Sequence, residues 1–318
     1  MPTDKRSSSS ESSPSDAGAA QKVVFVDAFT RMPFQGNPCA VVLGAQGLSG
    51  PQMLAIARET NAPETAFVLP SQRADIRVRY FTPRAEMPFA GHPTIATAHL
   101  LAREGLIPLH RPLTVLEMEF NIGVLPVEIS LAADNRPRWV RILQPAPQFG
   151  PRVAAAETAA ALGLAGEDLR SDLPVQVVNT GVPFLCVPAT GMAALRRVDL
   201  DRPRLKALLQ GVGVNAAYLF CMEALDPRNH AHARLLDPDN PGEDPYTGAA
   251  AGCLGAFAFH HRLHTGSELR LEQGHLLARP GEGVLDIVGN PDRIEGVGLR
   301  GAAVRTLEGR LLGIPDGE

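Results

Sequence analysis

The chain alternates between short apolar segments rich in β-branched and aromatic residues and turns rich in glycine, proline and asparagine. Such segments predict strands, and a run of them spans residues 22 to 145, at 22–29, 39–44, 65–70, 75–83, 113–119, 123–132 and 138–145. A second set is predicted at 174–180, 184–188, 217–223 and 230–238, with further strands after residue 261. Short helices are predicted at 51–60, 154–163 and 201–209. Many strands with few helices favour an α+β fold over a repeated βαβ fold.

Two further segments, 90–103 and 247–261, have the length of helices and are uncharged over most of it. A helix that is apolar on every side is normally buried on every side. Because the two segments lie about half the chain apart, we expect two similar halves, each a curved sheet around one central helix. The expected N-terminal half is 21–135 and the C-terminal half is 136–318. This boundary is approximate, since the final strand could return to the N-terminal half.

The starts of these two helices carry the first indication of function. Pro93 suits a first helical turn, where its missing N–H is not needed. Thr247 precedes Gly248 and offers a cap followed by exposed backbone donors. Two such N-termini facing each other would form an anion site, because free N–H groups and the helix dipole both favour negative charge. We therefore expect a small carboxylate as the ligand.

Composition narrows the possible classes of protein. The 318 residues are 45% hydrophobic and 20% charged with a net charge of -4, as in an ordinary globular protein. There is no basic excess that would indicate nucleic acid or an anionic membrane as partner. Residues 1–20 are Ser-rich without an apolar core, so we expect a disordered tail rather than a targeting signal. We expect a cytoplasmic protein whose four scattered cysteines are reduced thiols, with no zinc site.

Three motif-like stretches do not support the sites they resemble. "GVGLRG", 296–301, fits a dinucleotide fingerprint, but a strand-like segment follows where a helix is needed. "DPDNPGEDPYTG" starts like a calcium loop, yet Gly248 stands where the final glutamate belongs. His260 and His264 have the spacing of a metal pair without the zincin glutamate. No metal or cofactor is expected from these stretches.

Four blocks of the sequence resemble the PhzF-like family of phenazine-biosynthesis isomerases: "VDAFTRMPFQGNPCAVV", "NAPETAFV", "FTPRAEMPFAGHPTIATAHLLA" and "GEDPYTGAAAGCL". The resemblance implies a diaminopimelate epimerase-like α+β fold with the active site in a cleft between two halves. It also implies a homodimer without metal or organic cofactor. In the family's isomerases a glutamate moves a proton between carbons of a cyclic amino acid.

The resemblance also assigns roles to single residues. Glu64 matches the proton-carrying glutamate, and His92 and Asp244 match its catalytic partners. Gly91, Thr247, Gly248 and Ala249 match or adjoin the positions that bind the substrate carboxylate. Ala249 stands where the phenazine enzymes have serine, so the resemblance does not carry their substrate over to this chain.

Each assignment has a structural alternative. Glu64 taken alone is a loop carboxylate, His92 a histidine bonded to backbone at a helix start, and Asp244 a turn residue before a helix. Three functions follow: an acid/base isomerase or epimerase of a small carboxylate, a two-thiol racemase, and a carboxylate-binding or scaffold protein without turnover. The racemase would need cysteines at the positions of Ala90 and Thr247, where the chain has none.

Overall fold

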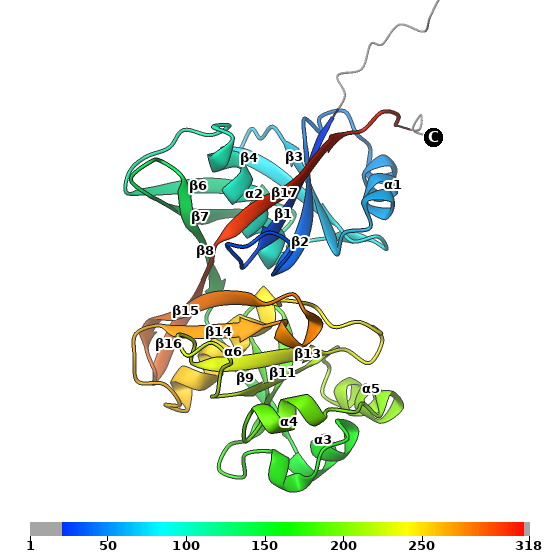
Figure 1. Cartoon of the computed structure of the whole chain (residues 1–318), viewed down its shortest axis with the longest axis vertical. Coiled ribbons are helices and arrows are strands. Elements are labelled where there is room, and N and C mark those ends of the chain that lie inside the picture. The colour runs from blue at the N-terminus through cyan, green and yellow to red at the C-terminus, as the bar shows by residue number, and fades with distance from the viewer. Residues whose placement is uncertain (1–20, 315–318) are drawn as a thin grey trace, which may run out of the picture.

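The structure is a computed structural model that describes residues 21–314. Two halves are stacked along the long axis of the molecule, and each consists of strands around one helix (Figure 1). The tail expected at 1–20 lies outside the described residues. Within the described part of the chain, no helix is long and apolar enough to cross a membrane.

The sheet of the N-terminal half follows the neighbour order β17-β1-β2-β3-β4-β6-β7-β8. The pairs β2–β3 and β4–β6 are parallel, and the other pairs in this order are antiparallel. The strands are β1 (Lys22–Ala28), β2 (Asn37–Leu43), β3 (Glu64–Leu69), β4 (Ile76–Phe81), β5 (Glu86–Met87), β6 (Leu113–Phe120), β7 (Gly123–Leu131), β8 (Pro137–Pro145) and β17 (Ala303–Arg310), and the helices are α1 (Gly50–Thr60) and α2 (Gly91–Arg103).

The C-terminal half repeats this plan with the order β9-β10-β11-β12-β13-β14-β15-β16, in which β11–β12 and β13–β14 are the parallel pairs. Parallel pairs therefore occupy the same places in both orders, so the predicted α+β fold with two similar halves is confirmed. The strands are β9 (Gln148–Val153), β10 (Val175–Asn179), β11 (Pro183–Pro188), β12 (Ala217–Cys221), β13 (Ala231–Leu236), β14 (Leu269–Gln273), β15 (Gly281–Asn290) and β16 (Arg293–Gly301), and the helices are α3 (Ala155–Ala161), α4 (Met192–Arg197), α5 (Arg202–Gly211) and α6 (Gly248–His260).

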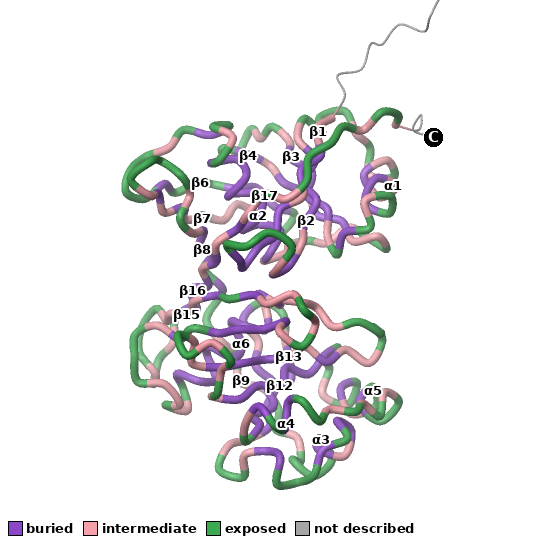
Figure 2. Tube along the Cα trace, viewed as in Figure 1, coloured by how far each residue is buried: buried purple, intermediate pink, exposed green. Residues whose placement is uncertain are grey.

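The two central helices make the crossovers that these parallel pairs require, since parallel strands cannot be joined by a tight turn. Helix α2 lies between β4 and β6 in sequence, and α6 lies between β13 and β14. Every residue of α2 from His92 to Ala102 is buried, as is nearly every residue of α6. Figure 2 shows buried positions along the inner strands and α6, with exposed positions on the outer loops. One apolar core contains residues of both helices.

Strands β8 and β16 pair antiparallel and join the two halves into one sheet. After β16 the chain continues into β17, which pairs with β1 in the N-terminal half. The segment "GVGLRG" therefore lies in a strand followed by another strand, as expected. Three of these strands and helices were not predicted, of which β5 has only two residues. Strand β9 contains Gly150 and Pro151, which weaken a strand signal, and α4 is only six residues long.

Gln144 of β8 anchors the first turn of α6. Its amide donates to the carbonyl of Gly248 at 2.9 Å and accepts the Thr180 hydroxyl at 2.6 Å. The Gln144 side chain has room at this point because Gly252 has no side chain. A Cβ on Gly252 would lie 1.8 Å from the Gln144 Oε1 atom. The glycine in α6 thus lets the strand that joins the halves hold the start of the helix.

We expect Gly252→Ala to lower the free energy of unfolding by about 1–3 kcal/mol, the usual cost of overpacking a core. Gly255→Ala is the matched control on the same helix, where the added Cβ would lie 3.3 Å from a Leu285 methyl. There the gain in helix propensity, about 1 kcal/mol, offsets the tighter contact. Denaturant unfolding compares the variants, and equal losses at both positions would contradict this account of Gln144.

Candidate active site

The N-termini of α2 and α6 abut where the two halves meet. A Cβ on Gly91 would lie 3.9 Å from the Cα of Gly248 and 4.0 Å from the backbone nitrogen of Ala249. The first N–H groups of a helix have no partner within the helix. In α2 and α6 no side chain caps them either. The expected pair of facing helix starts is present, and its free donors and dipoles favour an anion.

Thr247 has a different role from the cap that the sequence suggested. It is the N-cap residue of α6, but its side chain makes no capping hydrogen bond. The hydroxyl instead donates to Oδ2 of Asp244 at 2.6 Å. The short Asp244 side chain lies close enough to compete for this donor, and the start of α6 keeps its backbone N–H groups available.

Asn37, at the start of β2, connects Asp244 with the N-terminal half. Its amide nitrogen donates to Oδ1 of Asp244 at 2.6 Å and to the carbonyl of Tyr246 at 2.8 Å. The same nitrogen lies 3.3 Å from Nδ1 of His92. Sequence reasoning did not single out Asn37, although it stands in the quoted block "QGNPCAVV".

Gln273, the last residue of β14, supports the other side of Asp244. Its amide nitrogen donates to the Asp244 carbonyl at 2.7 Å, and its oxygen accepts from the Thr247 backbone N–H at 3.1 Å. The buried Tyr218 hydroxyl donates to that same oxygen at 2.7 Å and orients the amide. No local sequence signal marks Gln273, because its partners lie on other elements.

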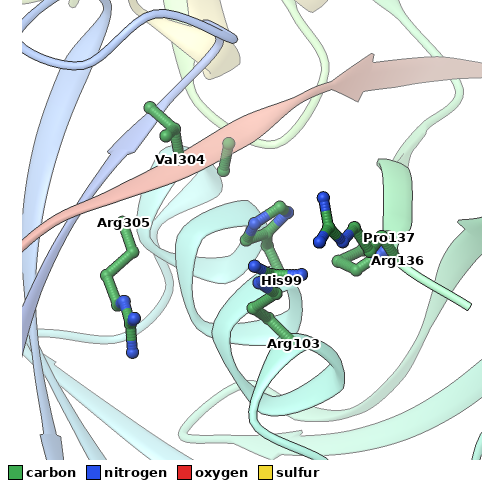
Figure 3. Close-up of a pocket in the computed structure, with 7 residues that line it drawn as sticks. His99, Arg103, Arg136, Pro137, Val304 and Arg305 are labelled. Carbon is green, nitrogen blue, oxygen red and sulfur yellow. The ribbon is translucent and has the colours of Figure 1, made fainter. Parts of the chain in front are cut away.

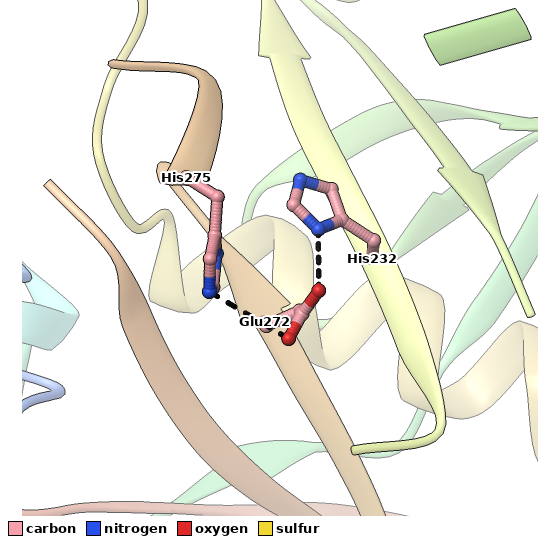
Figure 4. A group of neighbouring side chains, drawn as sticks. All are labelled: His232, Glu272 and His275. Atoms are coloured by element: carbon pink, nitrogen blue, oxygen red, sulfur yellow. Dashed lines mark hydrogen bonds and ion pairs between the residues drawn. The ribbon is translucent and has the colours of Figure 1, made fainter. Parts of the chain in front are cut away.

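Glu272, the neighbour of Gln273, is a buried anchor on β14 (Figure 4). Burial alone would raise the pKa of Glu272, but hydrogen bonds from His232, the Leu225 and Asp226 backbones and the Asn229 amide lower it to about 2. Its carboxylate oxygens are thus occupied by donors. A charged, fully bonded Glu272 fixes β14 and, through the next residue, Gln273.

His92, in the first turn of α2, lies between Asn37 and Glu64. Its Nε2 is 3.3 Å from both the Pro38 carbonyl and Oε2 of Glu64. Burial lowers the pKa of His92 to about 4, against the attraction of Asp244. The ring is therefore neutral at pH 7. Its proton belongs on Nε2, because that nitrogen faces two acceptors.

Glu64 is the first residue of β3 and pairs in register with Cys39 of β2. Its side chain is 22% exposed, so most of the side chain is covered while a part of it stays open to solvent. Burial raises the pKa of Glu64 from 4.5 to about 7. At neutral pH both protonation states are populated, which is what a group that takes and returns a proton requires.

Asp244 also titrates near neutrality. Burial raises the pKa of Asp244 from 3.8 to about 6, while His92 and the hydrogen bonds from Thr247 and Asn37 oppose the rise. A continuous chain of contacts therefore runs from Glu64 through His92 and Asn37 to Asp244. Carboxyl groups with raised pKa values beside a neutral histidine are typical of sites that move protons.

The two positions that a thiol pair would need are the N-cap residues of α2 and α6, Ala90 and Thr247. The four cysteines are all buried elsewhere. Burial raises the pKa of the Cys39 and Cys253 thiols above the ordinary value, which disfavours thiolates. The structure thus gives no support to the two-thiol racemase.

A family model described as phenazine biosynthesis-like protein (PhzC-PhzF) matches residues 26–309. The chain belongs to the PhzF-like family. It is 33% identical over 292 residues to trans-2,3-dihydro-3-hydroxyanthranilate isomerase of Pseudomonas aeruginosa, covering 91% of this chain and 98% of that protein. Because it belongs to this family and is related to a named isomerase, the chain is a PhzF-like isomerase.

Solved structures agree with the PhzF-like assignment. A PhzF family protein of Bacillus anthracis aligns with a TM-score of 0.84 and 30% identity, covering 93% of this chain and 100% of that one. A hydroxyproline epimerase from Agrobacterium vitis aligns with a TM-score of 0.56 and 13% identity over 92% of each chain, which shows a shared fold alone.

The raised pKa of Glu64 predicts a pH-dependent effect on stability. The folded state prefers the protonated carboxyl group, so wild-type stability falls as pH rises from 4.5 to 7. Glu64→Gln cannot ionise, so its stability relative to wild type should rise over that range, by up to about 3 kcal/mol above pH 7. Denaturant unfolding at pH 4.5 and pH 8 measures the difference. Glu59→Gln, exposed on α1, is the control, and an equal effect of both variants would contradict the prediction.

Proposed function

We propose that this isomerase works without a cofactor and moves a proton between carbons of a small carboxylate substrate, with Glu64 as the proton carrier. The observation that carries the proposal is the contact chain from Glu64 to Asp244 beside two uncapped helix N-termini. The substrate acted on by the Pseudomonas aeruginosa relative, a cyclic amino acid, is one member of the proposed class.

The paired helix starts supply the carboxylate subsite in this proposal. Their free N–H groups would donate to the substrate carboxylate, and the two helix dipoles would add favourable potential. A side chain on Gly91 would enter the space between the two starts. The glycines therefore allow the backbone donors of both halves to reach the same anion.

Proton transfer by Glu64 balances without an oxidant or a second reactant. The ionised carboxylate takes a proton from one carbon of the substrate, and the resulting acid returns it to another carbon. A pKa of about 7 keeps both states populated near neutral pH. The Nε2–H of neutral His92, 3.3 Å from the carboxylate, would orient Glu64 for both steps.

Asp244 has a substrate-binding role in this proposal, which complements proton transfer by Glu64. Asn37 and Thr247 hold its two oxygens, and Gln273 holds its backbone carbonyl. A carboxyl group fixed in this way cannot swing far from its position, so we assign it to holding a polar or charged substituent of the substrate. Its pKa of about 6 also lets it share a proton with that substituent.

Turnover in deuterated water tests the proposal with trans-2,3-dihydro-3-hydroxyanthranilate and a panel of small 2-amino and unsaturated acids. Wild type should place deuterium on a carbon of the product, and Glu64→Gln should lower the rate by at least about 100-fold, as for loss of a general base. Glu59→Gln should keep the wild-type rate. Full exchange by Glu64→Gln would refute the role of Glu64. Ligand binding without any exchange by wild type would instead favour the binding protein without turnover.

A second prediction concerns Ala249, where the phenazine enzymes have serine. Ala249→Ser would add a hydroxyl beside the proposed carboxylate subsite, and a hydrogen bond to a charged group contributes about 1.5–3 kcal/mol. We expect kcat/KM for trans-2,3-dihydro-3-hydroxyanthranilate to rise about 10- to 100-fold. Ala249→Gly, which changes size without adding a donor, is the control. An unchanged or lower kcat/KM in the serine variant would show that this hydroxyl does not limit the reaction.

A further inference from the structure

Two adjoining hollows lie where the chain passes between the halves. The smaller, about 290 Å³, and the larger, about 540 Å³, are lined by consecutive parts of the same two segments, 136–139 and 300–305. The first segment runs into the start of β8. The second contains the end of β16 and the start of β17. Neither hollow is lined by Glu64, His92 or Asp244. Together they are within the size range of small-molecule sites.

The lining of both hollows is strongly basic. Three arginines line the smaller hollow and five line the larger, against two carboxylates, Glu268 and Glu282, in the larger one alone. The chain as a whole has a net charge of -4, so the positive charge is a local feature. Concave walls that carry one sign of charge concentrate ligands of the opposite sign.

Several of these arginines have no counter-ion in the protein. Four of the eight are paired: Arg300 with Glu268, Arg136 with Asp134, Arg228 with Asp226, and Arg305 with Glu104 and Glu308. In contrast, four guanidinium groups make no hydrogen bond or ion pair with any residue in 21–314, namely Arg31, Arg103, Arg138 and Arg270. Arg103 lines the smaller hollow and the other three line the larger one. Unneutralised guanidinium groups favour a bound anion, because each presents several donors in a fixed plane.

His99 adds a buried polar group to the smaller hollow. Figure 3 shows its imidazole in the hollow, near the Arg136 side chain and the start of β17. The residue is 8% exposed, and its Nδ1 atom is buried without a partner. Burial, with Arg103 and Arg31, lowers the pKa of His99 to about 4, so the ring is neutral at pH 7. A buried nitrogen without a partner costs free energy, so the wall of the smaller hollow contains an unsatisfied polar group.

We propose that these two hollows form a binding site for a small multivalent anion, with guanidinium groups from both halves and the His99 imidazole as its ligands. Its chemistry is clustered negative charge, as in a diphosphate or a tricarboxylate. The site is separate from the proposed function. His99 lies seven residues after His92 on α2, about 10 Å further along the helix at 1.5 Å per residue.

The fluorescence of one tryptophan can report binding at this site. Trp139 is the single tryptophan, it lines the larger hollow, and the Arg300 guanidinium lies 5.5 Å from its ring centre. We expect inorganic pyrophosphate or citrate to change Trp139 fluorescence saturably, and acetate at equal ionic strength to leave it unchanged. Comparison of pyrophosphate with citrate shows whether phosphate or carboxylate groups are preferred. Calorimetry on the same samples measures the affinity independently of the fluorophore.

Variants decide whether the signal comes from this site. Arg138→Gln and Arg103→Gln should each weaken binding at least tenfold by calorimetry. Arg204→Gln removes the same charge from an exposed position on α5 and should not change it. The proposal would be overturned if neither anion produced a binding heat or a change in fluorescence. Equal weakening of binding in Arg204→Gln would also overturn it. A shift in sedimentation caused by Arg138→Gln or Arg103→Gln would also overturn it, because a second copy of the chain would then cover this face.

Discussion

The close approach of two buried helix N-termini is the constraint on which the rest of the structure depends. It requires that no side chain separates Gly91 from Gly248 and Ala249. It also requires that both helices be uncharged over most of their length, because each is wrapped by the sheet of its own half. A helix start buried without partners is costly, so this arrangement is stable only where an anion or water meets the free donors.

Burial at the same junction gives the ionisable groups their properties. The pKa values of Glu64 and Asp244 are raised toward neutrality, and the pKa of His92 is lowered far below it. All three shifts disfavour the charged form. At neutral pH the shifts of the two carboxyl groups therefore cost stability, whereas His92 is already neutral in the unfolded chain and its shift costs little. The surrounding hydrogen bonds of Asn37, Thr247 and Gln273 hold this unfavourable arrangement in place. In the proposed mechanism, the raised pKa that suits Glu64 to proton transfer therefore also lowers the stability of the folded chain.

The parts of this picture that are local in sequence could be predicted. The period of apolar residues predicted most strands, and the absence of charge predicted the burial of α2 and α6. Four blocks, one of them around Glu64, carried the family resemblance. Asn37, Gln144 and Gln273 could not be predicted in these roles, since each acts through partners on distant elements. The Thr247 hydroxyl was assigned to a cap because the preceding Asp244 gives no sequence sign that it takes the donor.

The two halves share one strand order, but different residues occupy their equivalent positions. Strand β3 begins with Glu64, whereas its counterpart β12 begins with Ala217. The helix caps are equally unlike, because Ala90 has no titratable group and the Thr247 hydroxyl is committed to Asp244. A reaction that inverts a carbon by two bases needs a proton carrier on each side of the substrate. In the proposed mechanism Glu64 of one half is the proton carrier and Asp244 of the other half holds the substrate, so the proton should leave and return on the same face. That asymmetry fits an isomerase that relocates a proton between carbons better than a racemase that inverts one.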